Sequence, residues 1–321
     1  MSTALLFSPQ GSQSVGMASA LVEGSASARE VFARADAVLG WSVTQLALEG
    51  PDERLNDTRY TQPALVTTSV AAAHALSEAL AAQGDDLAPA FVAGHSVGEY
   101  AALVLGEVLS LEDAVTLVAL RGELMAAQRI EGGMSAVIGL DRATVAAAIG
   151  PLAGPDGSDL VVANENAPGQ VVISGLHEAL AAAEEPLRAA GAKRVMPLKV
   201  SGPFHSPHMR SVGIQLERAF AGATWHDARI PLLSNVTADP VSDPVEIRGL
   251  LARQVSAPVE WVAVVERLAA EGVDTFVECG PGAALTGMVK RIVPGARLHN
   301  VADPAGVAQA ATALRGAEAS V

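Results

Sequence analysis

The sequence of 321 residues predicts an α/β fold in which helices cover a parallel sheet and a smaller domain is inserted. Along most of the chain, short apolar runs alternate with longer segments of helical period, the pattern of parallel sheets packed under helices. Between residues 131 and 199 the order changes to strand-helix-strand-strand-helix-strand, which is the ferredoxin-like order. The sequence therefore predicts a discontinuous large domain, residues 1–130 and 200–321, around a small domain at 131–199.

The elements of the large domain follow the alternating pattern in order. Its predicted strands are short and apolar, at residues 4–7, 88–93, 231–234 and 275–278. Its predicted helices span residues 64–82, 100–105, 111–129, 245–254 and 259–271. Ser110 is a suitable N-cap for the helix that follows it. We expect the tail after Arg315 to be frayed.

The small domain is predicted to begin after a Gly-Gly pair at residues 132–133. Its predicted strands lie at residues 134–140, 160–163, 170–174 and 194–200, and its helices at 142–150 and 177–190. A loop rich in Pro, Gly and Asp at residues 151–159 separates the first helix from the second strand.

The composition indicates a well-packed protein of a reducing, aqueous compartment. Half of the residues are apolar, and the formal net charge of −14 argues against wholesale binding to nucleic acid or to an anionic membrane. A single cysteine cannot form an internal disulfide. The N-terminus lacks the basic start of a signal peptide, and the most apolar long stretch, residues 63–81, is interrupted by His74 and Glu78. We therefore expect a cytoplasmic protein without a membrane anchor.

One motif carries nucleophilic chemistry. Residues 94–98 read Gly-His-Ser-Val-Gly, between a predicted strand and a predicted helix. This is the setting of a nucleophile elbow, in which two glycines permit a tight turn that lifts the serine hydroxyl clear of the sheet. The motif predicts that Ser96 forms covalent acyl esters. The alternative is a glycine-bracketed serine in an ordinary surface turn.

A serine nucleophile requires a general base, and two histidines are candidates. His205 and His208 follow the predicted strand at 194–200, where catalytic loops lie in open α/β sheets. His95 adjoins the serine, and backbone geometry points its side chain away from the hydroxyl. The residues alone do not decide between His205 and His208, and no Asp or Glu stands out as the third member of a triad.

Arg121 lies on the apolar stripe of its predicted helix. It follows Ala114 and Val118 and precedes Met125 at helical spacing. A guanidinium facing the core is costly unless it is paired, and its fork suits a carboxylate. The carboxylate either belongs to a buried Glu or Asp or arrives with the substrate.

No cluster of His, Cys and carboxylates has metal-ligand spacing, and no Gly-rich turn matches a dinucleotide or P-loop motif.

Several motifs in one order carry a resemblance to a known family. They are QGSQ at 10–13 with VGM at 15–17, GHSVGEY at 94–100, RG at 121–122 with LM at 124–125, NAPGQVVISG at 166–175, FHSP at 204–207, GPG at 280–282 and LTG at 285–287. Together they resemble the malonyl-CoA:acyl carrier protein transacylases, acyltransferases of fatty-acid and polyketide synthesis. The resemblance implies an α/β-hydrolase-like large domain with an inserted ferredoxin-like domain. The sequence departs from the family at residues 8–9, which are Ser-Pro where the family usually has Pro-Gly. The resemblance therefore does not determine the path of this loop.

The resemblance also implies a role for each site residue. Ser96 would be the nucleophile and His205, rather than His208, its base. A main-chain carbonyl near Gln254 would orient the histidine, giving a Ser-His dyad. The backbone N–H groups of Gln10 and Val97 would form the oxyanion hole. Arg121 would hold the free carboxylate of the malonyl group.

Two positions bear on the acyl group. Phe204 stands where methylmalonyl-selecting relatives commonly carry Ser, and Val97 stands in the elbow in place of Gln. The bulky ring of Phe204 leaves little room for an α-methyl group and so favours malonyl, and Val97 points the same way. Ordinary core packing is the alternative for each.

The implied partners are malonyl-CoA, as a coenzyme A thioester substrate, and acyl carrier protein, with no permanently bound cofactor and a monomeric enzyme. Because carrier proteins are acidic, docking needs local positive charge. The richest candidates are Lys193, Arg194, Lys199, Lys290 and Arg291. Solvated charges at the ends of strands and helices are the alternative. The rival functions are an acyltransferase serving a polyketide synthase in trans, a serine hydrolase that clears acyl groups, and a non-catalytic carrier-binding subunit.

Overall fold

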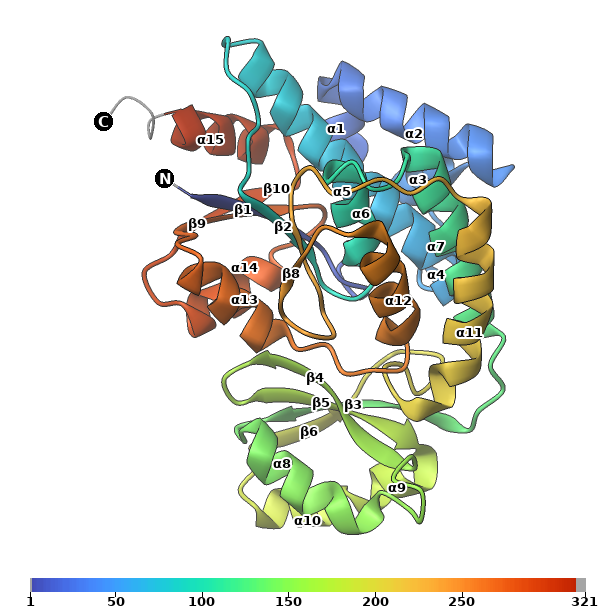
Figure 1. Cartoon of the computed structure of the whole chain (residues 1–321). Coiled ribbons are helices and arrows are strands. Elements are labelled where there is room, and N and C mark those ends of the chain that lie inside the picture. The colour runs from blue at the N-terminus through green and yellow to red at the C-terminus, as the bar shows by residue number, and fades with distance from the viewer. Residues whose placement is uncertain (1, 316–321) are drawn as a thin grey trace.

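A computed structural model describes residues 2–315, and the tail expected to be frayed lies outside this range. The described chain forms a six-stranded sheet of order β10-β9-β1-β2-β7-β8 (Figure 1). Its strands are β1 (Thr3–Phe7), β2 (Phe91–Gly94), β7 (Leu232–Leu233), β8 (Pro240–Val241), β9 (Thr275–Cys279) and β10 (Arg297–Val301). Every pairing is parallel except that of β7 with β8. The predicted α/β fold with a parallel sheet is confirmed.

The residues of β1 divide the core between the two faces of this sheet. Leu5 and Phe7 pack on one face, against helices that include α5 (Thr58–Ala81) and α7 (Leu111–Ala126). Ala4 and Leu6 pack on the other, against α13 (Trp261–Ala270) and α14 (Ala284–Ile292). Successive side chains of a strand point to opposite faces, so an unbroken apolar run is what a sheet covered on both sides requires.

Six further helices belong to the layers around this sheet. Neither the strands β8 and β10 nor these helices were predicted from the sequence. They are α1 (Ser19–Gly24), α2 (Ala26–Leu39), α3 (Val43–Glu49), α4 (Asp52–Leu55), α11 (Arg210–Ala219) and α15 (Pro304–Arg315). The assignment of α14 was also missed. Among residues 2–315, α5 is the one helix long and apolar enough to cross a bilayer, and 72% of its apolar window is buried inside the protein.

A second sheet is antiparallel, with order β4-β5-β3-β6, and lies below the first in Figure 1. Its strands are β3 (Gly132–Ile138), β4 (Leu160–Ala167), β5 (Gln170–Leu176) and β6 (Arg194–Pro197). The helices α8 (Arg142–Ile149), α9 (His177–Ala182) and α10 (Glu184–Ala189) cover it. The prediction of one helix over residues 177–190 was wrong. Pro186 lacks an N–H and crowds the carbonyl four residues earlier, so the chain forms two helices instead.

Strand β4 connects the two sheets. The Val259 N–H donates to the Ala163 carbonyl over 2.8 Å, and the Glu165 N–H donates to the Val259 carbonyl over 3.2 Å. Arg142 on α8 pairs with Glu260 beside this contact. Strand β4 runs four residues beyond the predicted end at 163, with register shifts that mark bulges. This extension brings polar residues of the second sheet towards the carboxyl end of the first.

Candidate active site

Ser96 lies in a sharp turn between β2 and α6 (Gly98–Leu105), in the left-handed conformation with φ of +53°. Glycine is required on both sides. A Cβ atom on Gly94 would lie 1.9 Å from the Gly98 carbonyl carbon, and one on Gly98 would lie 2.3 Å from the Phe7 carbonyl oxygen. The turn therefore presses α6 against the end of β1, and strain of this kind is expected where the fold presents a reactive group.

His205 contacts the serine hydroxyl directly. Its Nε2 atom lies 2.7 Å from Ser96 Oγ, and its Nδ1 atom lies 2.9 Å from the Gln254 carbonyl oxygen and 3.2 Å from that of Ala257. Two carbonyl acceptors place the ring proton on Nδ1 and leave Nε2 as the acceptor. Burial lowers the pKa of His205 to about 3, and the charge of Arg121 adds to this effect. The ring is therefore neutral at neutral pH.

The other candidate histidine does not reach the serine. His208 lies in a short 3₁₀ helix, Pro207–Met209, and its Nε2 atom is buried without a partner in the described structure. His95 points away from the hydroxyl, and its Nε2 lies 2.8 Å from Asn166 Oδ1 on β4. Burial lowers the pKa of His95 to about 4.

Arg121 is 1% exposed and belongs to the buried stripe of α7. Its Nη1 donates to Gln62 Oε1 over 2.7 Å, and its Nη2 donates to Ser96 Oγ over 3.1 Å and to Gln254 Oε1 over 3.0 Å. Within residues 2–315 no carboxylate forms an ion pair with it. A fully buried guanidinium therefore lies beside the serine among neutral oxygen acceptors.

Gln254, at the end of α12 (Pro244–Gln254), contacts several groups of the site at once. Its main-chain carbonyl accepts from His205, as given above. Its side-chain oxygen accepts from Arg121, and its amide nitrogen donates to the Ser96 carbonyl over 2.9 Å and to Glu99 Oε2. One buried residue thus fixes the relative positions of the serine, the histidine and the arginine.

Sequence reasoning missed three residues of this site: Gln62, Asn235 and Glu99. Asn235 Oδ1 accepts the Ser96 N–H over 2.6 Å, and its Nδ2 donates to the Gly94 carbonyl over 2.7 Å. The Asn235 N–H in turn donates to Glu99 Oε1 over 2.6 Å. Asn235 directly follows the strand at 231–234, and polar residues at the carboxyl ends of parallel strands are the signal that could have identified it.

The two predicted oxyanion donors have free N–H groups. Within residues 2–315 neither the Gln10 nor the Val97 main-chain N–H donates a hydrogen bond to the protein. The Ser96 N–H is held by Asn235 and is not available. The Gln10 side chain is anchored, since its Nε2 donates to Thr58 Oγ1 over 3.1 Å. Although Pro9 departs from the usual family sequence, the main-chain N–H of Gln10 is thus still free to donate to a substrate oxygen.

A cavity of about 430 Å³ opens over Ser96, His205 and Arg121. Phe204, Met125 and Met134 give it an apolar wall, and Asn164 and Asn166 of β4 contribute polar groups. The Phe204 side chain is buried against the core, and Val97 is buried as well.

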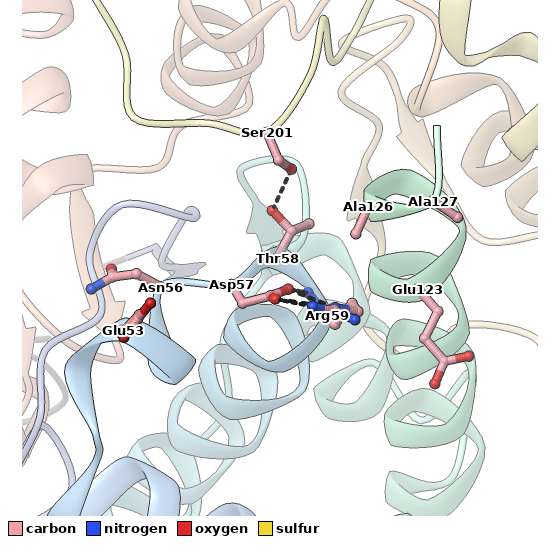
Figure 2. A pocket seen from close by; sticks show the side chains of 9 residues that line it. All are labelled: Glu53, Asn56, Asp57, Thr58, Arg59, Glu123, Ala126, Ala127 and Ser201. Carbon is pink, nitrogen blue, oxygen red and sulfur yellow. Dashed lines mark hydrogen bonds and ion pairs between the residues drawn. The ribbon is translucent and has the colours of Figure 1, made fainter. Parts of the chain in front are cut away.

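A second cavity, of about 460 Å³, lies next to the first and shares Asn56 with it (Figure 2). Its charged side chains include Asp57 and Arg59, which pair with one another. Figure 2 also shows the Thr58 hydroxyl turned towards that of Ser201, 3.3 Å away. Because the same Thr58 hydroxyl accepts from Gln10, this wall joins the Gln10 loop to the segment that leads to His205.

The predicted basic residues lie on the surface and differ in their surroundings. Lys193, Arg194 and Lys199 are exposed on and beside β6, and Lys199 also borders the cavity over Ser96. Lys290 is exposed on α14. Arg291 is engaged, because its guanidinium donates to Gln170 Oε1 over 2.8 Å and to the Pro168 carbonyl.

The chain matches the family model described as acyl transferase domain over residues 4–313. It is 43% identical to the malonyl CoA-acyl carrier protein transacylase of Salmonella typhimurium, covering 96% of this chain and 98% of that one. It is 39% identical to that of Bacillus subtilis, covering 94% and 93%.

Solved structures agree. The acyl-carrier-protein S-malonyltransferase of Burkholderia pseudomallei superposes with a TM-score of 0.91 at 38% identity, covering 97% of this chain and 100% of that one. A malonyl transacylase in complex with a type II polyketide synthase acyl-carrier protein gives the same TM-score and identity, covering 98% and 100%. The chain belongs to the acyl transferase family, among the malonyl CoA-acyl carrier protein transacylases.

Proposed function

We propose that this protein moves a malonyl group from malonyl-CoA to the phosphopantetheine thiol of acyl carrier protein through an ester on Ser96. The observation that carries the proposal is the buried Arg121 guanidinium, which contacts the serine hydroxyl and has no carboxylate partner among the described residues. An acyl group attached to Ser96 and ending in a carboxylate would supply a direct ion-pair partner for this guanidinium.

The reaction proceeds in two half-reactions. His205 Nε2 takes the proton of Ser96 as the hydroxyl attacks the malonyl thioester, and the same proton goes to the departing thiol of coenzyme A. The N–H groups of Gln10 and Val97 stabilise the negative oxygen of the tetrahedral intermediate. The carrier-protein thiol then gives its proton to His205 and attacks the ester. The bond between the acyl carbon and Ser96 Oγ breaks, and His205 returns the proton to Oγ, which restores the free serine hydroxyl. The Gln254 carbonyl holds the histidine in the required tautomer, as an acid does in a triad.

Phe204 and Val97 restrict the acyl group to malonyl. The Phe204 ring lines the cavity next to the base, where an α-methyl group of methylmalonyl would need room. Steric selection against one methyl group is worth about 1–3 kcal/mol. Comparable turnover of malonyl-CoA and methylmalonyl-CoA by the wild-type enzyme would contradict this role.

The proposed architecture is an α/β-hydrolase-like large domain, residues 1–130 and 200–321, with a ferredoxin-like domain at 131–199. The strand order β4-β5-β3-β6 supports the second name. The site lies where the two meet. No permanently bound cofactor takes part, and the enzyme acts in the cytoplasm as a monomer.

Carrier-protein docking uses exposed cations on and beside β6 and on α14, of which Lys199 borders the cavity. Lys193, Arg194, Lys199 and Lys290 are exposed, whereas Arg291 is tied to the β4–β5 turn. Lys199→Glu should therefore raise the KM for carrier protein more than that for malonyl-CoA. Equal changes in both KM values would count against this surface.

The likeness to a complex with a polyketide carrier protein favours a second candidate function, malonyl transfer in polyketide synthesis. Turnover with a fatty-acid carrier protein and with a polyketide carrier protein distinguishes the two functions.

The decisive experiment is intact-mass analysis of the protein after mixing with a panel of acyl-CoAs. We expect a stable malonyl adduct in the wild type and none in Ser96→Ala. Release of free malonate without transfer would indicate a hydrolase, and the absence of any adduct would indicate a non-catalytic subunit.

A further inference from the structure

Glu99 is a buried acid that the proposed reaction does not use. It lies in the first turn of α6, three residues after Ser96, and is 3% exposed. Both of its carboxyl oxygens face N–H donors: Oε1 accepts from the Asn235 main chain, and Oε2 from the Gln254 amide. Two N–H donors that face the two oxygens suit the ionised carboxylate, which only accepts hydrogen bonds.

Glu99 and Arg121 are joined through a single amide group. The Gln254 side chain receives the arginine on its oxygen and donates from its nitrogen to the glutamate. The positive charge of Arg121 and the negative charge of Glu99 thus lie at the two ends of one hydrogen-bonded chain and do not contact each other directly. Because a buried charge is costly without a counter-charge, the two groups balance each other when the cavity is empty.

We propose that Glu99 is the internal counter-charge of Arg121, and that it takes up a proton when an acyl group bearing its own carboxylate occupies the site. Glu99 then acts as a positioning residue that couples the charge of the substrate to the charge of the protein. The inference rests on the proposed function, because it requires a malonyl group on Ser96.

The surroundings of Glu99 leave few other groups that could respond. From α7 it faces Arg121, and from α12 and the segment after β7 it faces Gln254, Asn235 and apolar side chains such as Leu250. Its neighbour Tyr100 is neutral, since burial raises the pKa of that phenol. His205, bound to the Gln254 carbonyl, is also neutral above acidic pH.

The titration of Glu99 supports the proposal. Burial raises the pKa of its carboxyl to about 7, against the opposing effects of Asn235, Gln254 and the Arg121 charge. Adding a second carboxylate next to Arg121 cancels the charge that favours ionisation, so the pKa must rise further. A group that is mostly ionised in the empty enzyme at pH 7.5 is therefore more protonated in the malonyl-enzyme.

The test measures protons during acylation. Wild-type enzyme is mixed with malonyl-CoA at pH 7.5 in weak buffer with an indicator dye, and intact mass gives the amount of malonyl-enzyme. Transfer to serine releases the coenzyme A thiol and by itself consumes no proton. The ionisation of that thiol is measured with acetyl-CoA or, if the enzyme does not load it, with free coenzyme A in the same buffer. We expect an excess uptake of up to about three-quarters of a proton per malonyl-enzyme.

Two comparisons locate the proton. The excess should disappear in Glu99→Gln and persist in Glu278→Gln, which alters another buried acid. It should also disappear in the wild type at pH 5.5, where Glu99 is already protonated in the empty enzyme, so the test does not depend on the variant folding. No excess at pH 7.5, or an unchanged excess in Glu99→Gln, would overturn the inference. Failure to form malonyl-enzyme at all would instead overturn the proposed function.

Discussion

Two buried glutamates of this protein, Glu278 and Glu99, both accept hydrogen bonds from several donors but have different roles. Glu278, at the end of β9, accepts from the Leu285 and Thr286 main-chain N–H groups, from the Thr286 hydroxyl and from the Asn300 amide. All of these donors belong to the start of α14 and to β10. Glu99 accepts from Asn235 and Gln254, which also hold Ser96. A buried carboxylate therefore serves stability alone or also chemistry, according to what its donors hold besides it.

The largest expected effect concerns stability, at the first glutamate. Glu278→Ala leaves the main-chain N–H groups of Leu285 and Thr286 without an acceptor and takes one acceptor from the Thr286 hydroxyl and the Asn300 amide. It also removes the charge at the N-terminus of α14, so it should lower the free energy of unfolding by about 3–5 kcal/mol. Denaturant unfolding measures this loss. Malonyl transfer per folded molecule should remain near the wild-type value; a large fall would mean that both glutamates act on the reaction.

The next largest effect concerns the cation opposite Glu99. Arg121→Ala should reduce kcat/KM for malonyl-CoA by about 10²–10³-fold, a loss of roughly 3–4 kcal/mol in transition-state binding. Transfer of a neutral acetyl group should fall much less. Steady-state kinetics with both thioesters gives the comparison, and equal losses would refute the contact with the substrate carboxylate.

A smaller effect is expected at Asn235, which links Glu99 to the serine. Asn235→Ala removes the acceptor of the Ser96 N–H and the donor to the Gly94 carbonyl, so the elbow loses two buried hydrogen bonds of about 1 kcal/mol each. We expect kcat to fall by about 10–100-fold with little change in KM. A change confined to KM would show that Asn235 shapes the cavity rather than the nucleophile.

The smallest effect is a difference in pH dependence. The pKa values of His205 and His95 are lowered to about 3 and about 4, so the unfolded chain binds more protons than the folded one below about pH 6.5, and stability is lost on acidification. The pKa of Glu99 is raised to about 7, so its contribution has the opposite sign and is lost as the pH rises from 4.5 to 7. Glu99→Gln should therefore be more acid-sensitive than wild type, on the order of 1 kcal/mol per pH unit between pH 4.5 and 7.

Unfolding at pH 5, 6 and 7 measures this difference directly. Parallel pH profiles for the wild type and Glu99→Gln would show that another group titrates. Glu278→Gln gives the control profile, since it removes a buried carboxyl away from the histidines.

Much of the fold follows from local pattern, and much of the site does not. The strand-helix alternation, the glycines around Ser96 and the stripe bearing Arg121 depend on residues close in sequence, and the structure places them as predicted. The early end predicted for β4 followed from its polar residues at 164–166, of which Asn164 and Asn166 line the cavity. Residues such as these break the apolar pattern because they line the site.

The network around Glu99 could not be predicted from the same signals. Asn235 and Gln254 reach the elbow across separations of 136–158 residues, and each looks like an ordinary polar residue after a strand or at the end of a helix. What identifies them is the number of groups that each one holds. That number is known only when the chain is folded.

Ser96 and His205 share one further feature, a left-handed backbone, with φ of +53° and +55°. For residues other than glycine this conformation costs about 1–2 kcal/mol each, so selection for stability alone would favour glycine at both positions. At these two residues, selection for activity and selection for stability therefore favour different amino acids. In a descendant of this protein that has lost its substrate, these are positions where we expect the sequence to drift first.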